Sequence, residues 1–300
     1  MVLYIAGCGR SGSTLLARLL GEIDGFVPVG ELRYVFDRGL VANHLCGCGQ
    51  PFRSCPFWSG VLLRAWGVEG EAAAALGRRA SSVDRLRYLP MLLARWARSP
   101  SFRQRLGEHV DVLGRLYRSL AVETGGAVVV DSSKDPSYAY VLANVPGIDL
   151  RIVHLVRDSR AVAHSWTRIK VRPEVHQEVA YLRRRRPSHS AMLWDAQNGL
   201  CDLLVAAGIP TVRIRYEDLV DDLEAVLATV TAHVGRPRTR RDSARTVHDI
   251  SGNPLRFSSG PLRVAADFEW HTAAAPAERR LVSALTAPQL WRYGYRIRRT

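Results

Sequence analysis

The N-terminal segment contains the feature that most constrains the fold. An apolar run from Val2 to Ala6 (VLYIA) is typical of a buried strand, and the glycine-rich stretch Gly7 to Thr14 (GCGRSGST) follows it directly. The next segment, Thr14 to Leu20 (TLLARLL), has the composition and apolar spacing of a helix. A strand, a glycine turn and a helix N-terminus together form an anion site, because unpaired backbone N–H groups and the helix dipole point at the same place.

The glycine-rich stretch fits two phosphate-binding patterns and completes neither. Its three glycines match the G-x-G-x-x-G of dinucleotide-binding turns, and Glu31 follows at about the place of a ribose ligand. The same residues also match a P-loop, except that Ser13 stands where that pattern has its phosphate-binding lysine. The missing lysine indicates a different anion or a cation supplied from elsewhere. Arg10, inside the loop, is the nearest candidate.

Apolar runs of strand length recur along the chain and alternate with helical patterns. They lie at Val2 to Ala6, Phe26 to Val29, Ala127 to Val130, Ile152 to Val156 and Thr211 to Ile214. This alternation predicts an α/β fold with a P-loop-like parallel sheet flanked by helices.

The segments between these runs predict the rest of the organisation. From about Phe57 to Leu120 the pattern is helical, which indicates a helical insertion that is either a packing layer or a pocket wall. A second helical stretch is expected from Glu174 to Ala207, with an interruption near Pro187. The run Arg183 to Arg186 within it is either a solvated helix end or an anion-binding lid. The Gly and Pro residues from Ser251 to Arg263 exclude a helix or a central strand there.

The charge balance indicates an anionic partner. The net charge is +14 and nearly all of the basic residues are arginines, with Lys134 and Lys170 as the two lysines. We expect no nucleic-acid binding, because the sequence has neither aromatic residues interleaved in a basic stripe nor a readable recognition helix. No apolar run reaches the length of a membrane span, and the N-terminus is predicted to be the first strand, so we expect a cytoplasmic protein.

A second phosphate site is predicted far from the N-terminal loop. The strand-like run Ile152 to Val156 ends directly at Arg157, and Ser165 follows on the helix that this strand leads into. A guanidinium at a strand end can bind phosphate oxygens, and a hydroxyl two turns along the next helix can complete the set.

Together, the two segments resemble the sulfotransferases that use 3′-phosphoadenosine 5′-phosphosulfate (PAPS). In that family a loop of the type P-[KR]-S-G-[ST]-T binds the 5′-phosphosulfate, and a later R-[DN]-P-R-x-x-x-x-S binds the 3′-phosphate. The residues that match the first motif are Arg10, Ser11, Gly12, Ser13 and Thr14, and those that match the second are Arg157, Asp158, Arg160 and Ser165. Ser159 replaces the usual proline, a position that mainly shapes the turn.

Three further segments resemble the bacterial branch of this family. They are VVVDSSKDP (Val128 to Pro136), RYEDLV (Arg215 to Val220) and GNPLRFSSGP (Gly252 to Pro261). The resemblance implies that Tyr216 and Arg256 also contact the nucleotide. It extends to about residue 270, so we expect a single sulfotransferase domain over residues 1–300 that contains the helical insertion at about 57–120.

The resemblance implies transfer of a sulfuryl group from PAPS to a hydroxyl or amine of a small-molecule acceptor, such as a natural product, a carbohydrate or a lipid. No metal is expected, because a phosphosulfate carries less charge than the triphosphate of a kinase and Arg10 with backbone N–H groups can suffice. The alternatives are a divergent P-loop kinase and an NADP-binding reductase. A reductase would need the Arg157 site only if its cofactor carried a 2′-phosphate.

The catalytic residues are predicted from position and resemblance. Sulfuryl transfer needs cations near the leaving oxygen, which Arg10 and Lys134 can supply. Lys134 lies in a Lys-Asp-Pro segment similar to that of tyrosylprotein sulfotransferases, which also carry a Gly-Glu after the second strand, where Glu31 stands here. We therefore predict Glu31 as the general base. The rival candidates for the base are His44, His154 and His164, and Asp131 is a candidate for an orienting role. Trp194 and Asn198, one helical turn apart, face either the cleft or the core.

Five cysteines leave a choice of chemistry at one cluster. Cys46, Cys48 and Cys55 lie close together with His44 nearby, but their spacing is not one of the common zinc patterns. A metal site, a disulfide and free thiols are all compatible with it, and the sequence favours free thiols. Cys8 and Cys201 have the character of small apolar fillers.

Overall fold

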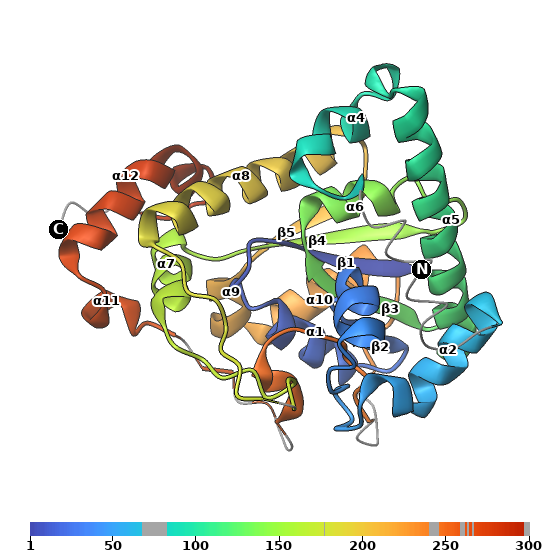
Figure 1. The fold of residues 1–300 in the computed structure, drawn as a ribbon. Coiled ribbons are helices and arrows are strands. Elements are labelled where there is room, and N and C mark those ends of the chain that lie inside the picture. Colours follow the sequence, from blue (N-terminus) through green and yellow to red (C-terminus); the bar gives the residue numbers. More distant parts are fainter. Residues whose placement is uncertain are drawn as a thin grey trace.

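The computed structural model describes residues 1–67, 83–176, 178–239, 246–258, 262, 264–265 and 267–296. Its centre is a five-stranded sheet with the order β2-β3-β1-β4-β5, and every neighbouring pair of strands is parallel (Figure 1). The strands are β1 (Val2–Gly7), β2 (Phe26–Gly30), β3 (Val128–Lys134), β4 (Leu150–Val156) and β5 (Thr211–Arg215). The predicted strands and the predicted α/β class are thus confirmed.

Helices cover both faces of the sheet (Figure 1). The α-helices are α1 (Ser13–Gly21), α2 (Pro56–Trp66), α4 (Leu89–Leu93), α5 (Pro100–Glu123), α6 (Pro136–Leu142), α7 (Ser159–Thr167), α8 (Pro187–Ala206), α9 (Tyr216–Asp221), α10 (Leu223–His233), α11 (Trp270–Ala273) and α12 (Pro276–Arg292). Shorter 3₁₀ or π segments are η1 (Leu32–Tyr34), η2 (Val35–Val41), η3 (Phe52–Ser54), η5 (Leu86–Tyr88), η6 (Arg95–Ala97) and η7 (Pro254–Phe257). Among the described helices, none combines the length and apolar composition needed to cross a bilayer.

The central strand explains how the two faces are buried. All six residues of β1 are buried, and successive side chains of a strand point to opposite faces. Tyr4 and Ala6 belong to one core with α2, α5 and α6, whereas Leu3 and Ile5 belong to the other core with α1 and α10. A continuous apolar run is therefore the expected pattern for this strand, because both of its faces are covered.

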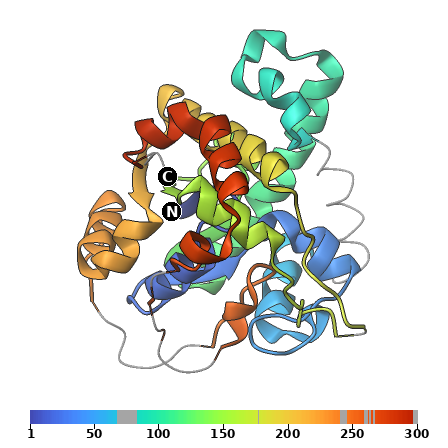
Figure 2. The same cartoon turned by 90° about the vertical axis from the view of Figure 1, so that its left-hand side faces the viewer.

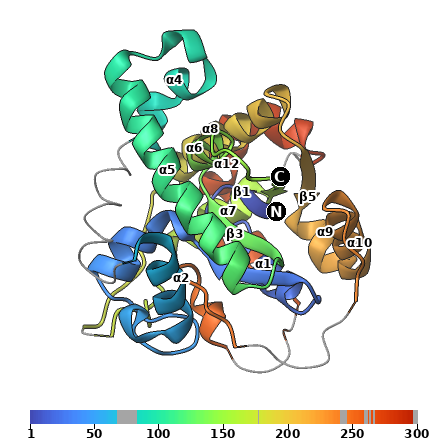
Figure 3. The same cartoon turned by 90° about the vertical axis from the view of Figure 1, so that its right-hand side faces the viewer.

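The region expected to be a helical insertion contains α2, α4 and α5, and residues 68–82 of it lie outside the described part. In Figure 3, α5 crosses one side of the molecule beside α2, and α4 lies at the end of α5 that is farther from α2. Phe102, Leu106 and Leu113 of α5 join the core cluster that also holds Trp58 and Val61 of α2. This packing fixes α2 beside the sheet.

The second helical prediction was wrong before Pro187. Helix α8 begins at Pro187, a residue suited to the first turn of a helix, and the described residues before it form an irregular turn. In that turn the N–H of Arg172 donates to the carbonyl of Ala180 at 2.8 Å, and the N–H of Leu182 donates to the carbonyl of Lys170 at 2.8 Å. These hydrogen bonds between the two arms of the turn take the place of helical hydrogen bonds. Figure 2 shows the yellow-green segment after α7 near the orange segment around η7.

The strand order also predicts where a ligand lies. The chain leaves β1 towards β2 on one side of the sheet and leaves β4 towards β5 on the other. Such a reversal opens a crevice at the carboxyl ends of β1 and β4. The glycine-rich loop follows β1 and Arg157 follows β4, so the topology brings the two predicted phosphate sites to one crevice.

Candidate active site

A cavity of about 590 Å³ lies at this edge of the sheet. Its walls come from the loop after β1, the segments after β2, β3 and β4, helices α7 and α8, and the turn before η7. Nine of the lining residues are Arg or Lys and three are Asp or Glu. This excess of positive charge suits an anionic ligand with several charges.

The glycine-rich loop enters the cavity through the start of α1. Gly12 is the N-cap residue with φ of 94°, a left-handed conformation that glycine adopts without strain. A Cβ atom on Gly12 would lie 2.5 Å from the Tyr216 ring, so the glycine also permits close packing. Ser13 and Thr14 line the cavity at the helix N-terminus, where N–H groups are free to bind an anion.

Ser11 belongs to the loop but does not line the cavity. Its hydroxyl donates to the carbonyl of Cys8 at 2.7 Å and the residue is buried. The side chain therefore shapes the loop, and only its backbone remains as a donor for a ligand. Thr14 Oγ1 accepts a hydrogen bond from the N–H of Asn253 at 3.3 Å, which ties the loop to the turn before η7.

Arg10 supplies a cation inside the loop. Its guanidinium lies 4.7 Å from the centre of the Trp166 ring, and Arg185 lies 4.1 Å from the same ring. Burial lowers the pKa of Arg10, since the charged form loses solvation there. The buried Arg10 Nε and Arg185 Nη1 have no hydrogen-bond partner among the described residues. Buried donors of this kind indicate a site that is completed by a ligand.

Arg157 lies at the end of β4 and its side chain is held in place on several sides. The guanidinium lies 4.4 Å from the centre of the Tyr216 ring, donates to the carbonyl of Arg10 at 3.2 Å and pairs with Asp267 at 3.0 Å. Trp194 Nε1 donates to the backbone carbonyl of Arg157 at 2.9 Å. The buried Arg157 Nε has no partner among the described residues. The guanidinium thus keeps donor capacity towards the cavity.

Helix α7 carries the second part of this site. Asp158 is its N-cap residue and accepts from the N–H of Arg160 at 2.8 Å, while the Arg160 side chain pairs with the same carboxylate at 2.6 Å. These contacts fix the start of the helix. Ser165, near the end of this helix, lines the cavity with Trp166.

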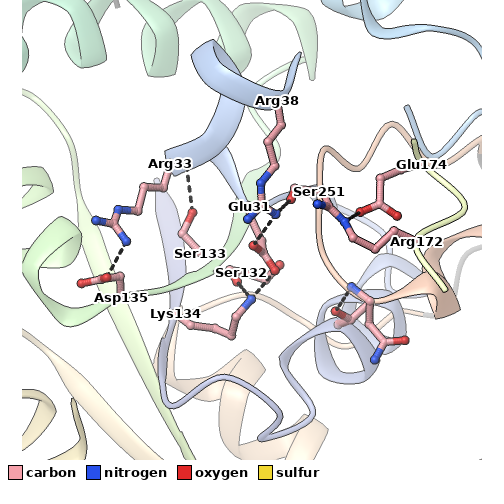
Figure 4. Close-up of polar contacts among 12 residues, drawn as sticks. Glu31, Arg33, Arg38, Ser132, Ser133, Lys134, Asp135, Arg172, Glu174 and Ser251 are labelled. Carbon is pink, nitrogen blue, oxygen red and sulfur yellow. Dashed lines mark hydrogen bonds and ion pairs between the residues drawn. The ribbon is translucent and has the colours of Figure 1, made fainter. Parts of the chain in front are cut away.

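Glu31 and Lys134 both line the cavity, and their side chains meet there (Figure 4). Glu31 follows β2, and its Oε1 accepts a short hydrogen bond from Lys134 Nζ. Its other oxygen, Oε2, lies 4.0 Å from Arg38 Nη1. The N–H of Glu31 donates to the carbonyl of Ile250 at 2.7 Å, so a segment far along the chain sets the backbone position of this carboxylate.

Lys134 lies at the end of β3 in a left-handed conformation with φ of 70°. Its ammonium also donates to the carbonyl of Ser132 at 3.1 Å. Asp131 accepts from both the N–H and the hydroxyl of Ser133, at 2.9 and 2.5 Å, and burial raises the pKa of Asp131 to about 6. Asp131 thus shapes the turn that precedes Lys134.

The structure places the histidines weighed as rival bases away from the cavity wall. His154 is fully buried in β4 and shares a hydrogen bond with Asn198 at 2.9 Å, and burial lowers the pKa of His154 to about 4. His164 lies 4.0 Å from Glu269, and His44 is half-buried, with its pKa lowered by burial. The lining residues of the cavity include none of the three.

Arg256, Trp194 and Asn198 also lie outside the lining of the cavity. Arg256 is 2% exposed, and its guanidinium donates to the backbone carbonyls of Asp249 at 2.6 Å and Leu45 at 2.9 Å. It therefore joins two chain segments. Trp194 and Asn198 are buried in the core beneath Arg157 and His154.

The sequence model of the sulfotransferase family matches residues 3–240 of this chain. The chain belongs to the sulfotransferase family. Among solved structures, it is similar to the sulfotransferase domain of the Synechococcus PCC 7002 olefin synthase, with a TM-score of 0.59, 18% identity, and coverage of 99% of this chain and 95% of that one. It is also similar to the sulfotransferase domain of the curacin biosynthetic pathway, with a TM-score of 0.55, 15% identity, and coverage of 99% and 98%. A search of curated protein sequences gives no match.

These two likenesses show that the sulfotransferase α/β fold is shared. The kinase and reductase alternatives are not favoured, because the family match includes the glycine-rich loop on which both alternatives rest.

Several lining residues of this sulfotransferase were not predicted. Lys170 reaches the cavity, and burial together with Arg10 and Arg168 lowers its pKa. Its rarity was a usable signal, since both lysines of the chain line this one cavity. Arg38 and Asp267 carried no such signal, because only their spatial neighbours distinguish them from other charged residues.

Proposed function

We propose that this sulfotransferase moves the sulfuryl group of PAPS to a hydroxyl or amine of a small-molecule acceptor and releases 3′,5′-adenosine bisphosphate (PAP). The observation that carries the proposal is that the N-terminal loop and the pair Arg157 and Ser165 line one cavity, although they are far apart in the sequence. A donor with a phosphosulfate at one end and a 3′-phosphate at the other needs two such anion sites in one crevice.

The N-terminal loop would bind the phosphosulfate. Ser13 and Thr14 line the cavity at the start of α1 together with Arg10, and the backbone N–H groups of this helix end would bind the anion. Arg157 and Ser165 would bind the 3′-phosphate, and Tyr216 packs against both Gly12 and Arg157. A phosphate would compete with Asp267 for Arg157, because it offers more charge and more acceptor oxygens to the guanidinium fork than one carboxylate.

Glu31 would act as the general base. The acceptor oxygen or nitrogen forms a bond to sulfur, the bond from sulfur to the bridging oxygen of the nucleotide breaks, and the proton of the acceptor passes to the Glu31 carboxylate. Lys134 and Arg10 stabilise the charge that develops on the bridging oxygen, and PAP leaves with that charge. The short hydrogen bond between Lys134 and Glu31 supports this pairing of roles, since it holds base and cation together on one wall.

The donor would also change the partner of Lys134. A phosphosulfate competes with Glu31 for the same ammonium, so donor binding frees a carboxylate oxygen for the acceptor. Arg38, 4.0 Å from the other oxygen, would then hold the carboxylate in position. The remaining walls, with Tyr34, Leu182 and Leu193, leave room for a small organic acceptor. We propose the cytoplasm as the compartment of the reaction, as predicted from the sequence.

The experiment that tests this function is a transfer assay with radiolabelled PAPS against a panel of phenols, alcohols, sugars and amines, combined with calorimetry of PAP in buffer without magnesium. We expect PAP binding without the metal and PAPS-dependent labelling of at least one acceptor. PAP binding that requires added magnesium, or release of ADP from ATP in place of sulfate transfer, would refute the proposal in favour of a kinase.

A further inference from the structure

Three cysteines and one histidine meet outside the cavity, between the loop after η2 and the segment before η7. Cys46 and Cys48 lie in the loop, Cys55 is the N-cap residue of α2, and His248 comes from the far end of the sequence. Their ligand atoms all lie within 4.8 Å of one another. Cys55 Sγ lies 3.3 Å from His248 Nδ1 and 3.7 Å from Cys48 Sγ, and Cys46 Sγ lies 3.9 Å from the same nitrogen.

These distances suit the corners of a tetrahedron around one zinc ion. Zinc bonds of about 2.3 Å to sulfur and about 2.0 Å to nitrogen place neighbouring ligand atoms roughly 3.5–3.8 Å apart. Cys48 and Cys55 do not form a disulfide, because both thiols are free and their sulfurs lie 3.7 Å apart. Three sulfur ligands and one imidazole nitrogen form a donor set that zinc prefers over hard cations.

The backbone around the cluster is shaped to bring His248 to the cysteines. Gly47 lies so close to the His248 segment that a Cβ atom there would be 2.9 Å from the carbonyl of Val247. The N–H of Gly47 donates to the carbonyl of Asp249 at 2.9 Å. The His248 ring stacks on Phe57 with 4.7 Å between ring centres. These contacts hold Nδ1 towards the sulfurs.

We propose that Cys46, Cys48, Cys55 and His248 bind one zinc ion. Four protein ligands leave no open position on a tetrahedral zinc, so the ion is structural. Cys46 and Cys55 are fully buried, which shields the site from solvent.

The zinc ion would connect this site to the cavity through a short path. His248 is two residues before Ile250, whose N–H donates to the carbonyl of Val29 at 3.0 Å and whose carbonyl accepts from the N–H of Glu31. The zinc ion therefore anchors the segment that positions the Glu31 backbone. It takes no part in the reaction itself.

Elemental analysis of the full chain, expressed with added zinc, tests the proposal directly. We expect about one zinc per chain in the wild-type protein and in the Cys8→Ala and Cys201→Ala variants, which remove buried thiols outside the cluster. The Cys48→Ser and His248→Gln variants should lose the ion to a competing chromogenic chelator that leaves the wild-type protein loaded. Equal retention by wild type and both variants would overturn the assignment.

A second measurement does not depend on the folding of variants. Cobalt added to zinc-depleted wild-type protein should produce the absorption bands of tetrahedral cobalt with thiolate ligands, and zinc should abolish them. Zinc should also protect three thiols from alkylation, as counted by mass spectrometry. A spectrum without thiolate bands, full alkylation in the presence of zinc, a disulfide between two of the three cysteines, or bound iron in place of zinc would each refute the zinc site.

Discussion

The two walls of the cavity differ in how the chain builds them. Both sides are named for their proposed roles. The nucleotide side consists of Gly9, Arg10 and residues 12–14 after β1, Arg157 after β4, and Ser165 on helix α7. The base side consists of Glu31, Lys134 and Arg38, together with residues 246–255 that return beside β2.

On the nucleotide side, backbone geometry and helix N-termini set the positions, and these follow from local sequence. On the base side, the Glu31 backbone and the Arg38 side chain are hydrogen-bonded to Ile250 and Ser251, about two hundred residues away, in a segment that the proposed zinc site would anchor. Local motifs therefore suffice to position the proposed donor-binding residues, whereas the proposed reacting groups need tertiary packing. The two walls should respond differently to mutation, and four predictions test this difference.

The largest effect is expected on the base side, from Glu31→Gln. Loss of the base should lower kcat by roughly 10²–10⁴-fold, because the acceptor then keeps its proton in the transition state. Steady-state kinetics with a saturating acceptor measure this. Glutamine keeps the size and hydrogen-bonding capacity of the side chain, so PAP affinity and Tm should stay near the wild-type values. A folded variant that keeps activity within about threefold of wild type would exclude Glu31 as the base.

A smaller effect, confined to donor binding, is expected from Arg157→Ala on the nucleotide side. Loss of a hydrogen bond to a charged group weakens PAP binding by about 1.5–3 kcal/mol. Calorimetry should show this loss for PAP and little change for adenosine 5′-phosphosulfate, which lacks the 3′-phosphate. If both nucleotides lose the same affinity, Arg157 supports the fold and does not bind the 3′-phosphate.

Acid should destabilise the strand that carries Arg157. Burial lowers the pKa of His154 and of His109 to about 4, from the ordinary value of 6.5. Between pH 4 and pH 6.5 the unfolded chain therefore binds more protons than the folded protein. The contribution of these buried histidines to the free energy of unfolding is complete above pH 6.5 and is lost as the pH falls towards 4. Tm measured from pH 7 to 5 should fall less steeply for His154→Gln than for the exposed control His189→Gln. Equal slopes would show that His154 does not contribute.

The smallest effect is expected from His44→Ala. His44 does not line the cavity, and the described cluster contains His248 in its place. Zinc content and kcat/KM should both stay within about twofold of wild type, which is the scale of a substitution away from the groups that carry function or stability. A fall in kcat at unchanged zinc content would make His44 the next candidate for the base and would weaken the division between the two walls.

Local patterns were enough to predict the sheet and the positions of the nucleotide-side residues at its edge. The five strands, Arg10, Gly12 and Arg157 follow from apolar runs, a glycine turn and strand ends, each of which acts over a few residues. The same patterns failed for residues 174–186, where helical composition gave way to hydrogen bonds across a turn. A helix was not favoured there, because those backbone groups bond to the other arm of the turn.

The sequence by itself determined the α/β class, the glycine-rich turn before α1 and the place of Arg157 at a strand end, because these depend on residue type and short spacing. Only the tertiary structure placed Glu31 on Lys134, moved Arg256 away from the cavity and replaced His44 by His248 beside the three cysteines. The contacts of Glu31 with Lys134, of Arg256 with Leu45 and of His248 with the cysteines join residues separated by about one hundred to two hundred positions. Their partners are decided by how the parallel strands pack and where the chain returns, and no periodicity along the chain records that.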